Sequence, residues 1–191
     1  MSNAQVRATR VAMIALAVMG GTGVTIVTGQ AFAQEPGRPG ADARGDDSRS
    51  GSAPGNLQPL EEVKVVGTFR VQEGGAQVYT CTGGAFVLKA PEAVLADGDR
   101  SIHHFGGPSW QSEQDGSTVT AAKVAEQPVE GSIPELLLQV NGHSGPEGEL
   151  SEVTFIQRLR TSGGAAPAGP CQEGTELPVA YRADYVFLAR G

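Results

Sequence analysis

Two adjacent histidines, His103 and His104, are the residues of this 191-residue chain whose types best suit chemistry. The stretch 101–105 predicts a strand, and neighbouring side chains of a strand point to opposite faces. One ring should therefore face the interior or a cleft, while the other faces solvent. A neutral His104 in a cleft can act as a general acid or base or hydrogen-bond a ligand. The alternative is a structural histidine that is hydrogen-bonded within the protein.

Trp110 is the only tryptophan in the chain. It follows Gly106-Gly107-Pro108, a rigid turn that can direct its ring toward a pocket. An exposed tryptophan suits stacking on a sugar or another flat ligand. We therefore expect Trp110 to be partly exposed in a concave patch, with packing in the core as the alternative.

Gln157 and Arg158 are polar residues inside an otherwise apolar segment, 150–160. One of them can line a site, although a polar outer face of the sheet explains them equally well. Together with His104 and Trp110, they complete the set of candidate binding residues.

The common catalytic and metal-binding motifs are missing from the sequence. Gly142-His143-Ser144-Gly145 comes closest to a nucleophile elbow, but Pro146 stands where the second glycine is required. There is no phosphate loop and no His-Glu-x-x-His. Asp97-Gly98-Asp99 is more typical of a solvated turn than of a calcium site. No metal site and no cofactor are therefore expected, and no catalytic residue can be assigned.

The elements that position these residues are predicted to be strands. Apolar residues alternate with polar ones at period two from about residue 60, and Gly-rich turns separate the segments. The expected strands cover 63–71, 76–82, 86–88, 101–105, 117–124, 133–140, 150–160 and 178–189. This pattern predicts an all-β, mainly antiparallel single domain over 60–191, either a β-sandwich or a barrel-like fold.

Details of this fold also follow from the pattern. The turn at Glu73-Gly74-Gly75 predicts a hairpin between the first two strands. Residues 90–97 are expected to form one helical turn or a loop. The run Leu136-Leu137-Leu138 indicates a strand covered on both faces. The aromatic residues near 181–187 are expected to form core.

The first 33 residues resemble a secretory signal. Arg7 and Arg10 precede an apolar stretch, and Ala31-Phe32-Ala33 fits the small-x-small cleavage rule. We expect cleavage near Ala33 and a secreted protein, with an uncleaved membrane anchor as the alternative. Residues 34–59 are rich in Gly, Pro, Ser and charges, which predicts a disordered linker.

The charge of the chain limits the class of partner. Removal of residues 1–33 would remove two arginines and no acid, leaving 12 basic residues against 21 acidic ones and a net charge of −9. Nucleic acids and anionic membranes need a basic surface, so neither is an expected partner of the mature protein. The expected partner is a small molecule or a component of the cell envelope.

Cys81 and Cys171 are the only cysteines. In an exported chain a single pair most simply forms a disulfide. The alternative, a redox or metal role, is disfavoured because the two residues are far apart and there is no Cys-x-x-Cys.

Short motifs spread over residues 76–191 support a family assignment. They are Tyr79-Thr80-Cys81-Thr82, Ala90-Pro91-Glu92-Ala93, His104-Phe105-Gly106-Gly107-Pro108, Trp110, Asp115-Gly116-Ser117, Ile133-Pro134, Leu136-Leu137-Leu138, Val153-Thr154-Phe155-Ile156-Gln157-Arg158-Leu159, Thr161, Gly163-Gly164-Ala165-Ala166-Pro167, Cys171, Tyr181 and Ala183-Asp184-Tyr185. In this order they resemble the exported proteins catalogued as domain of unknown function 3455. Glu135 and Leu188 depart from the pattern, since the family favours an aromatic at each position. The resemblance implies secretion and supplies no catalytic residue.

Three hypotheses of function follow from these residues. The first is a secreted β domain that binds a small ligand or an envelope component near Trp110 and His104. The second is an extracellular enzyme that uses His104 as acid or base, with Gln157 or Arg158 stabilising negative charge; it requires a carboxylate or nucleophile within hydrogen-bond reach of His104. The third is a structural or protein-interaction domain, which predicts no sizeable pocket.

Overall fold

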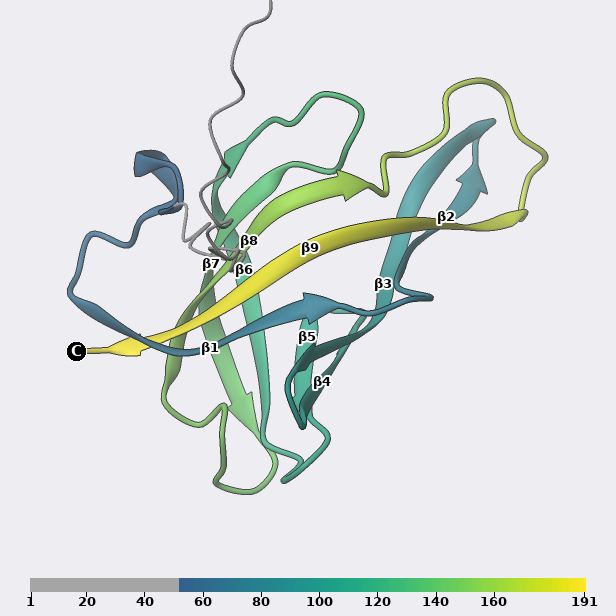
Figure 1. Ribbon diagram of the computed structural model, residues 1–191. Helices are drawn as coiled ribbons and strands as arrows, with labels where there is room; N and C mark the ends of the chain where they lie inside the picture. Colours follow the sequence, from purple (N-terminus) through teal and green to yellow (C-terminus); the bar gives the residue numbers. More distant parts are fainter. Residues whose placement is uncertain (1–51) are drawn as a thin grey trace, which may run out of the picture. The chain divides into compact units, whose positions relative to one another are not determined.

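The computed structural model describes residues 52–191, and the expected signal and most of the expected linker lie outside this part of the chain. The described residues form one short 3-10 helix and nine antiparallel strands (Figure 1). The elements are η1 (Gly55–Leu57), β1 (Val63–Val71), β2 (Ala76–Thr82), β3 (Ala85–Asp97), β4 (Arg100–Phe105), β5 (Ser109–Ser112), β6 (Thr118–Gln127), β7 (Glu135–Ser144), β8 (Val153–Gly163) and β9 (Glu176–Arg190). The predicted all-β fold is confirmed.

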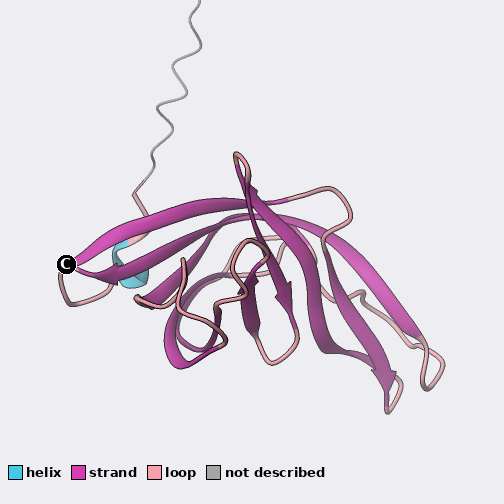
Figure 2. Ribbon diagram, turned by 90° about the horizontal axis from the view of Figure 1, so that it is seen from below, coloured by secondary structure: helices cyan, strands magenta, loops and turns pink. Residues whose placement is uncertain are grey.

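Eight of the strands close into a barrel-like ring, which is visible in the strongly curved strands of Figure 2. Around the ring the order is β1-β9-β8-β7-β6-β5-β4-β3, and β3 returns to β1 through the pair Arg70↔Ala96. β2 lies outside this ring, where it pairs with residues 85–92 of β3 and 176–180 of β9. The long strands β3 and β9 therefore belong both to the ring and to a three-stranded extension.

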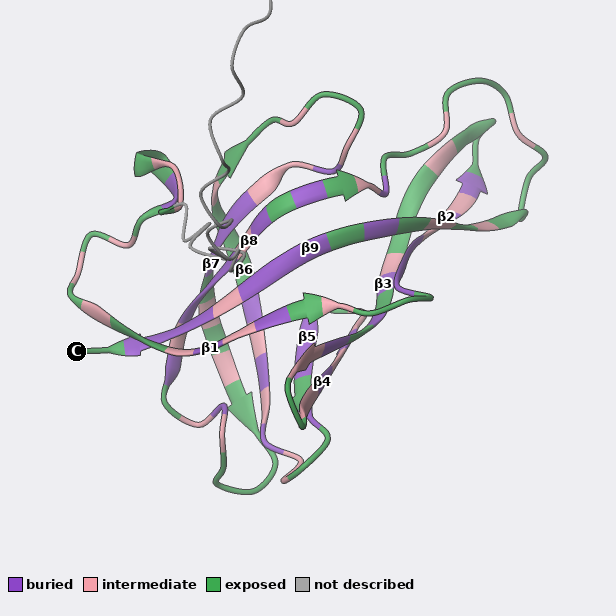
Figure 3. Ribbon diagram, in the orientation of Figure 1, coloured by how far each residue is buried: buried purple, intermediate pink, exposed green. Residues whose placement is uncertain are grey.

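The interior of the ring holds the main hydrophobic core, to which every strand of the ring contributes. On β9 the inward positions are Tyr181, Ala183, Tyr185 and Phe187, all nearly inaccessible to solvent. Figure 3 shows buried segments along β9. These residues were expected to form core because their spacing is that of one strand face.

A second, smaller cluster covers the outer face of β7, β8 and β9. Leu57 of η1 is fully buried there against Leu137, Phe155 and Leu188. Leu136 and Leu138 face the main core while Leu137 faces this outer cluster, so β7 is covered on both sides as predicted. Leu57 belongs to the segment for which the sequence predicted a linker, and its burial shows that packing against the ring begins before residue 60.

Two local predictions are wrong, and one short strand was not predicted. β1 and β2 follow one another but do not pair, because β1 hydrogen-bonds to β9 and β3 instead. Residues 90–97 are part of the continuous strand β3 rather than a helical turn or loop, because they bridge β2 on one side and β4 on the other. Trp110 lies on a short strand, β5, held between β4 and β6.

The disulfide between Cys81 and Cys171 is present, as predicted, with the Cα atoms 5.9 Å apart. It ties the loop before β9 to β2, and Cys81 N also donates to Thr175 O at 2.8 Å. Within residues 52–191, no helix has the length and apolarity that crossing a membrane requires.

Candidate functional site

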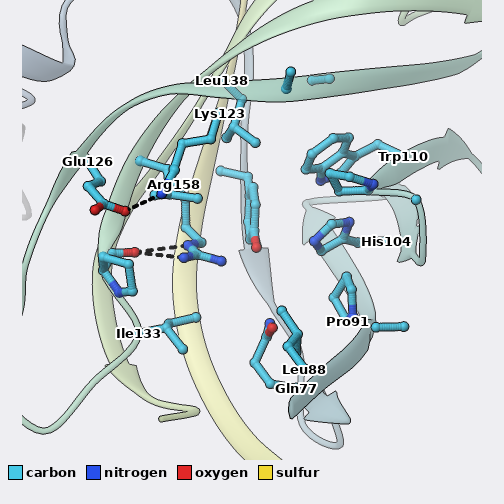
Figure 4. Close-up of a pocket in the computed structure, with 18 of the residues that line it drawn as sticks. Gln77, Leu88, Pro91, His104, Trp110, Lys123, Glu126, Ile133, Leu138 and Arg158 are labelled. Atoms are coloured by element: carbon cyan, nitrogen blue, oxygen red, sulfur yellow. Dashed lines mark hydrogen bonds and ion pairs between the residues drawn. The ribbon is translucent and has the colours of Figure 1, made fainter. Parts of the chain in front are cut away.

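A pocket of about 680 Å³ lies where the β2–β3 extension meets the ring (Figure 4). Strands β2 to β9 all contribute to its lining. Much of the wall is apolar and comes from Leu88, Pro91, Ile133, Leu136 and Leu138. Pockets that bind small organic molecules have this volume and this predominantly apolar lining.

Three of the four candidate residues from the sequence line this pocket, namely His104, Trp110 and Arg158. A second cavity, of about 650 Å³ against the β1–β2 turn and Arg182, contains none of the four. The pocket at the end of the ring is therefore the candidate functional site.

The His104 and Trp110 rings form a stacked pair across β4 and β5. The two residues face each other in the strand register, and their ring centroids are 4.4 Å apart at an interplanar angle of 5°. Tyr185 meets the His104 ring edge-on at 5.2 Å. Cross-strand aromatic pairs of this kind stabilise a sheet and hold both rings in fixed positions.

The expectation that Trp110 is partly exposed is wrong, because only 1% of the residue is accessible. The stacked imidazole and the surrounding core cover its ring. It nevertheless contributes to the wall of the pocket.

His104 is held as a neutral side chain. Its Nδ1 donates to the backbone oxygen of Ser109 at 2.9 Å, because a carbonyl oxygen can only accept. Burial lowers the pKa of His104 to about 3, the Ser109 hydrogen bond opposes this shift, and the charges of Arg158 and His103 add to it. Nδ1 keeps the proton, and Nε2 is left as an acceptor.

In the described part of the chain, the His104 ring does not have the carboxylate or nucleophile partner that the enzyme hypothesis requires. Among residues 52–191, the ring bonds only to the Ser109 carbonyl, and no carboxylate or hydroxyl oxygen lies within hydrogen-bond distance of it. His103 lies on the opposite face of β4, half-exposed, with its Nε2 2.6 Å from Glu92 Oε1. The prediction that the two rings face opposite sides is confirmed.

Gln157 and Arg158 also separate onto opposite faces of β8. Gln157 Nε2 donates to Leu57 O at 2.7 Å, so this side chain anchors η1 to the outer face and takes no part in the pocket. Arg158 points inward, where Nε and Nη2 donate to Pro134 O at 3.1 and 2.8 Å (Figure 4). The two side chains separate because neighbouring side chains of any β-strand point to opposite faces of the sheet.

Among the lysines and arginines of residues 52–191, Arg158 alone is at least partly buried and has no carboxylate oxygen within 4.0 Å. Lys64 and Arg182 also lack an ion pair there, but both are exposed. The two lysines at the edge of the pocket are paired, Lys89 with Glu176 at 2.5 Å and Lys123 with Glu126 at 2.6 Å. The pocket therefore presents one positive charge that no carboxylate neutralises.

Polar groups also lie behind the apolar wall. The Tyr181 and Tyr185 hydroxyls are 3.3 Å apart, and burial raises the pKa of both, so each keeps its proton. Within residues 52–191, Gln77 Nε2 and Trp110 Nε1 are buried donors with no hydrogen-bond partner. Leaving such a donor unpaired costs about 1–3 kcal/mol.

Gln77 and Tyr79 line the pocket but were not among the sequence candidates. The signal that could have found them is the alternation of β2, which places residues 77 and 79 on the same face as the buried Cys81. A glutamine on that face is a polar group in an inward position. Tyr79 is held there because its hydroxyl donates to Gly164 O at 2.6 Å.

No group of three or more residues of the types that ligate metals is assembled within residues 52–191. Asp97, part of the Asp-Gly-Asp segment, forms an ion pair with Arg100 across the turn between β3 and β4. This segment is a turn, as expected.

Comparison with known proteins places the chain in a family. A family model described as "Protein of unknown function (DUF3455)" matches residues 88–189. The match includes His104, Trp110 and Arg158, whereas Gln77 and Tyr79 precede it. Neither the curated proteins nor the solved structures contain a significant match.

Proposed function

The chain belongs to the DUF3455 family of proteins of unknown function, and we propose that its β domain binds a small, largely apolar organic molecule. The observation that carries this proposal is the pocket of about 680 Å³, walled mainly by apolar side chains at the end of the ring. Burial of a ligand's apolar surface against that wall supplies about 25 cal/mol per Å².

The walls of the pocket support binding because they are fixed before a ligand arrives. The stacked His104–Trp110 pair belongs to the core of the ring, and the disulfide and the Tyr79–Gly164 hydrogen bond tie β2 to the loop before β9. A site that is already ordered loses little conformational entropy on binding.

The two other hypotheses have less support. The enzyme hypothesis requires a carboxylate or nucleophile beside the His104 imidazole, whereas the ring bonds to a backbone carbonyl. A pure interaction domain was expected to have no sizeable pocket, whereas the structure has one of about 680 Å³. We also propose that the protein is exported; the leader pattern of residues 1–33 and the disulfide support this location.

Fluorescence titration with N-phenyl-1-naphthylamine, a neutral apolar dye, tests the proposal on the full chain. We expect the dye to bind and its emission to rise. We also expect Ala90→Phe, which narrows the pocket, to weaken binding. Ala85→Phe is the matched control, because Ala85 is an exposed residue of the same strand outside the pocket lining. No binding by the wild type, or an equal loss in both variants, would contradict the proposal.

A further inference from the structure

The chemical class of the ligand follows from the charge that the pocket leaves unpaired. Of the three basic side chains in the lining, Lys89 and Lys123 already pair with Glu176 and Glu126. Arg158 is only partly exposed and pairs with a backbone carbonyl. Taking a cation out of water is unfavourable unless an anion or a full set of hydrogen bonds compensates it.

The guanidinium of Arg158 also has unused donors. An arginine carries five N–H groups, and Pro134 O receives one from Nε and one from Nη2. Of the three N–H groups that remain, one interacts with the Tyr185 hydroxyl, and the other two are left for another acceptor. A carboxylate or sulfonate matches the fork geometry of these donors and forms strong, charge-assisted hydrogen bonds with them.

The surrounding groups show that the charge of Arg158 acts on the pocket. It opposes the rise that burial produces in the pKa of Tyr79 and Tyr185, and it adds to the lowering of the pKa of His104. All three residues line the pocket. Near Arg158 the pocket is therefore positive, although the chain as a whole carries a formal charge of −7.

We propose, on the basis of the proposed function, that the ligand is an organic monoanion whose single oxyanion group binds Arg158 and whose apolar body fills the space toward the His104–Trp110 pair. One unpaired cation matches one negative charge. A dianion such as a phosphate monoester would need the rim lysines to give up their carboxylate partners. Arg158 is then the residue that determines charge specificity.

Two dyes with the same skeleton test this inference. 1-Anilinonaphthalene-8-sulfonate carries one sulfonate, and N-phenyl-1-naphthylamine lacks it. We expect the full chain to bind the sulfonate dye about ten- to a hundredfold more tightly, the range for hydrogen bonds to a charged group. Excitation of Trp110, the only tryptophan, should sensitise the emission of a dye bound in this pocket.

Arg158→Met should abolish the preference for the sulfonate dye while binding of the neutral dye persists. Binding of the neutral dye also reports that the variant has kept its pocket, although Arg158→Met loses the hydrogen bonds to Pro134. Arg158→Lys should restore part of the preference because it restores the charge. Arg182→Met is the matched control, since Arg182 is an exposed arginine that lines the second cavity and has no ion pair within residues 52–191.

The outcomes separate this inference from the function on which it rests. Failure of both dyes to bind overturns the binding function itself. Equal affinity for the two dyes overturns the monoanion and leaves the binding function standing. A sulfonate preference that survives Arg158→Met, or disappears in Arg182→Met, shows that the anion binds elsewhere and also overturns the inference.

Discussion

Removing the disulfide should cost this domain more stability than removing any single hydrogen bond. The bond joins residues 90 positions apart, and loop-closure entropy for a loop of that length gives about 4.6 kcal/mol at 25 °C. That is a large fraction of the 5–15 kcal/mol that separates typical folded domains from their unfolded states. The chain with the disulfide formed should therefore stay folded under conditions in which the chain without the disulfide begins to unfold.

The assay is equilibrium unfolding in urea of the oxidised chain and of the double variant Cys81→Ala, Cys171→Ala. Cys81 is fully buried, so the double variant also loses sulfur packing. The reduced wild type is the matched control, because it keeps both side chains and lacks only the bond. The difference between oxidised and reduced wild type should approach 4–5 kcal/mol. A difference below about 1 kcal/mol would refute the reasoning, because loop-closure entropy would then not be the quantity that sets the effect of the disulfide on stability.

Two further predictions concern His104 inside the ring and Gln157 on its outer face. Burial lowers the pKa of His104 to about 3, so between about pH 6.5 and pH 3 the unfolded chain binds a proton at His104 that the native chain does not bind. The free energy of unfolding should therefore fall by about 3 kcal/mol from pH 7 to pH 4. Urea unfolding of His104→Phe should show a smaller fall over the same pH range. Equal pH dependence in both proteins would count against this assignment. Gln157→Ala should destabilise the domain by about 1–3 kcal/mol, because it leaves the buried Leu57 carbonyl unpaired. Dye binding should stay unchanged, and an altered dye affinity would mean that the outer face of β8 is coupled to the pocket.

The sequence was most informative where period-two alternation decides the outcome. It separated His103 from His104 and Gln157 from Arg158, because neighbouring side chains on a strand must point to opposite faces. It did not decide which member of the second pair faces inward. That choice depends on η1, whose Leu57 carbonyl receives the Gln157 amide from a point 100 residues earlier in the chain.

Partner choice between strands was the part that could not be predicted. A Gly-rich turn after β1 is compatible with a hairpin, but the bonds that β1 makes with β9 join the two ends of the domain. A β-bulge between Val65 and Gly67 also shifts the face of β1, so that Val65 is 63% exposed whereas Phe69, an even number of residues later, is fully buried. Contacts of this kind are long-range, and local periodicity contains no information about them.

The sharing of β3 and β9 between the ring and the extension has a mechanical consequence. Each strand runs without interruption from one side of the pocket into the core, so the β2–β3 hairpin cannot swing as a hinged lid without bending a strand that the ring holds. The tip of that hairpin, by contrast, carries exposed residues and no core contact. Changes of length at residues 83–85 should therefore leave the pocket unaltered, because its lining on β3 begins at Leu88.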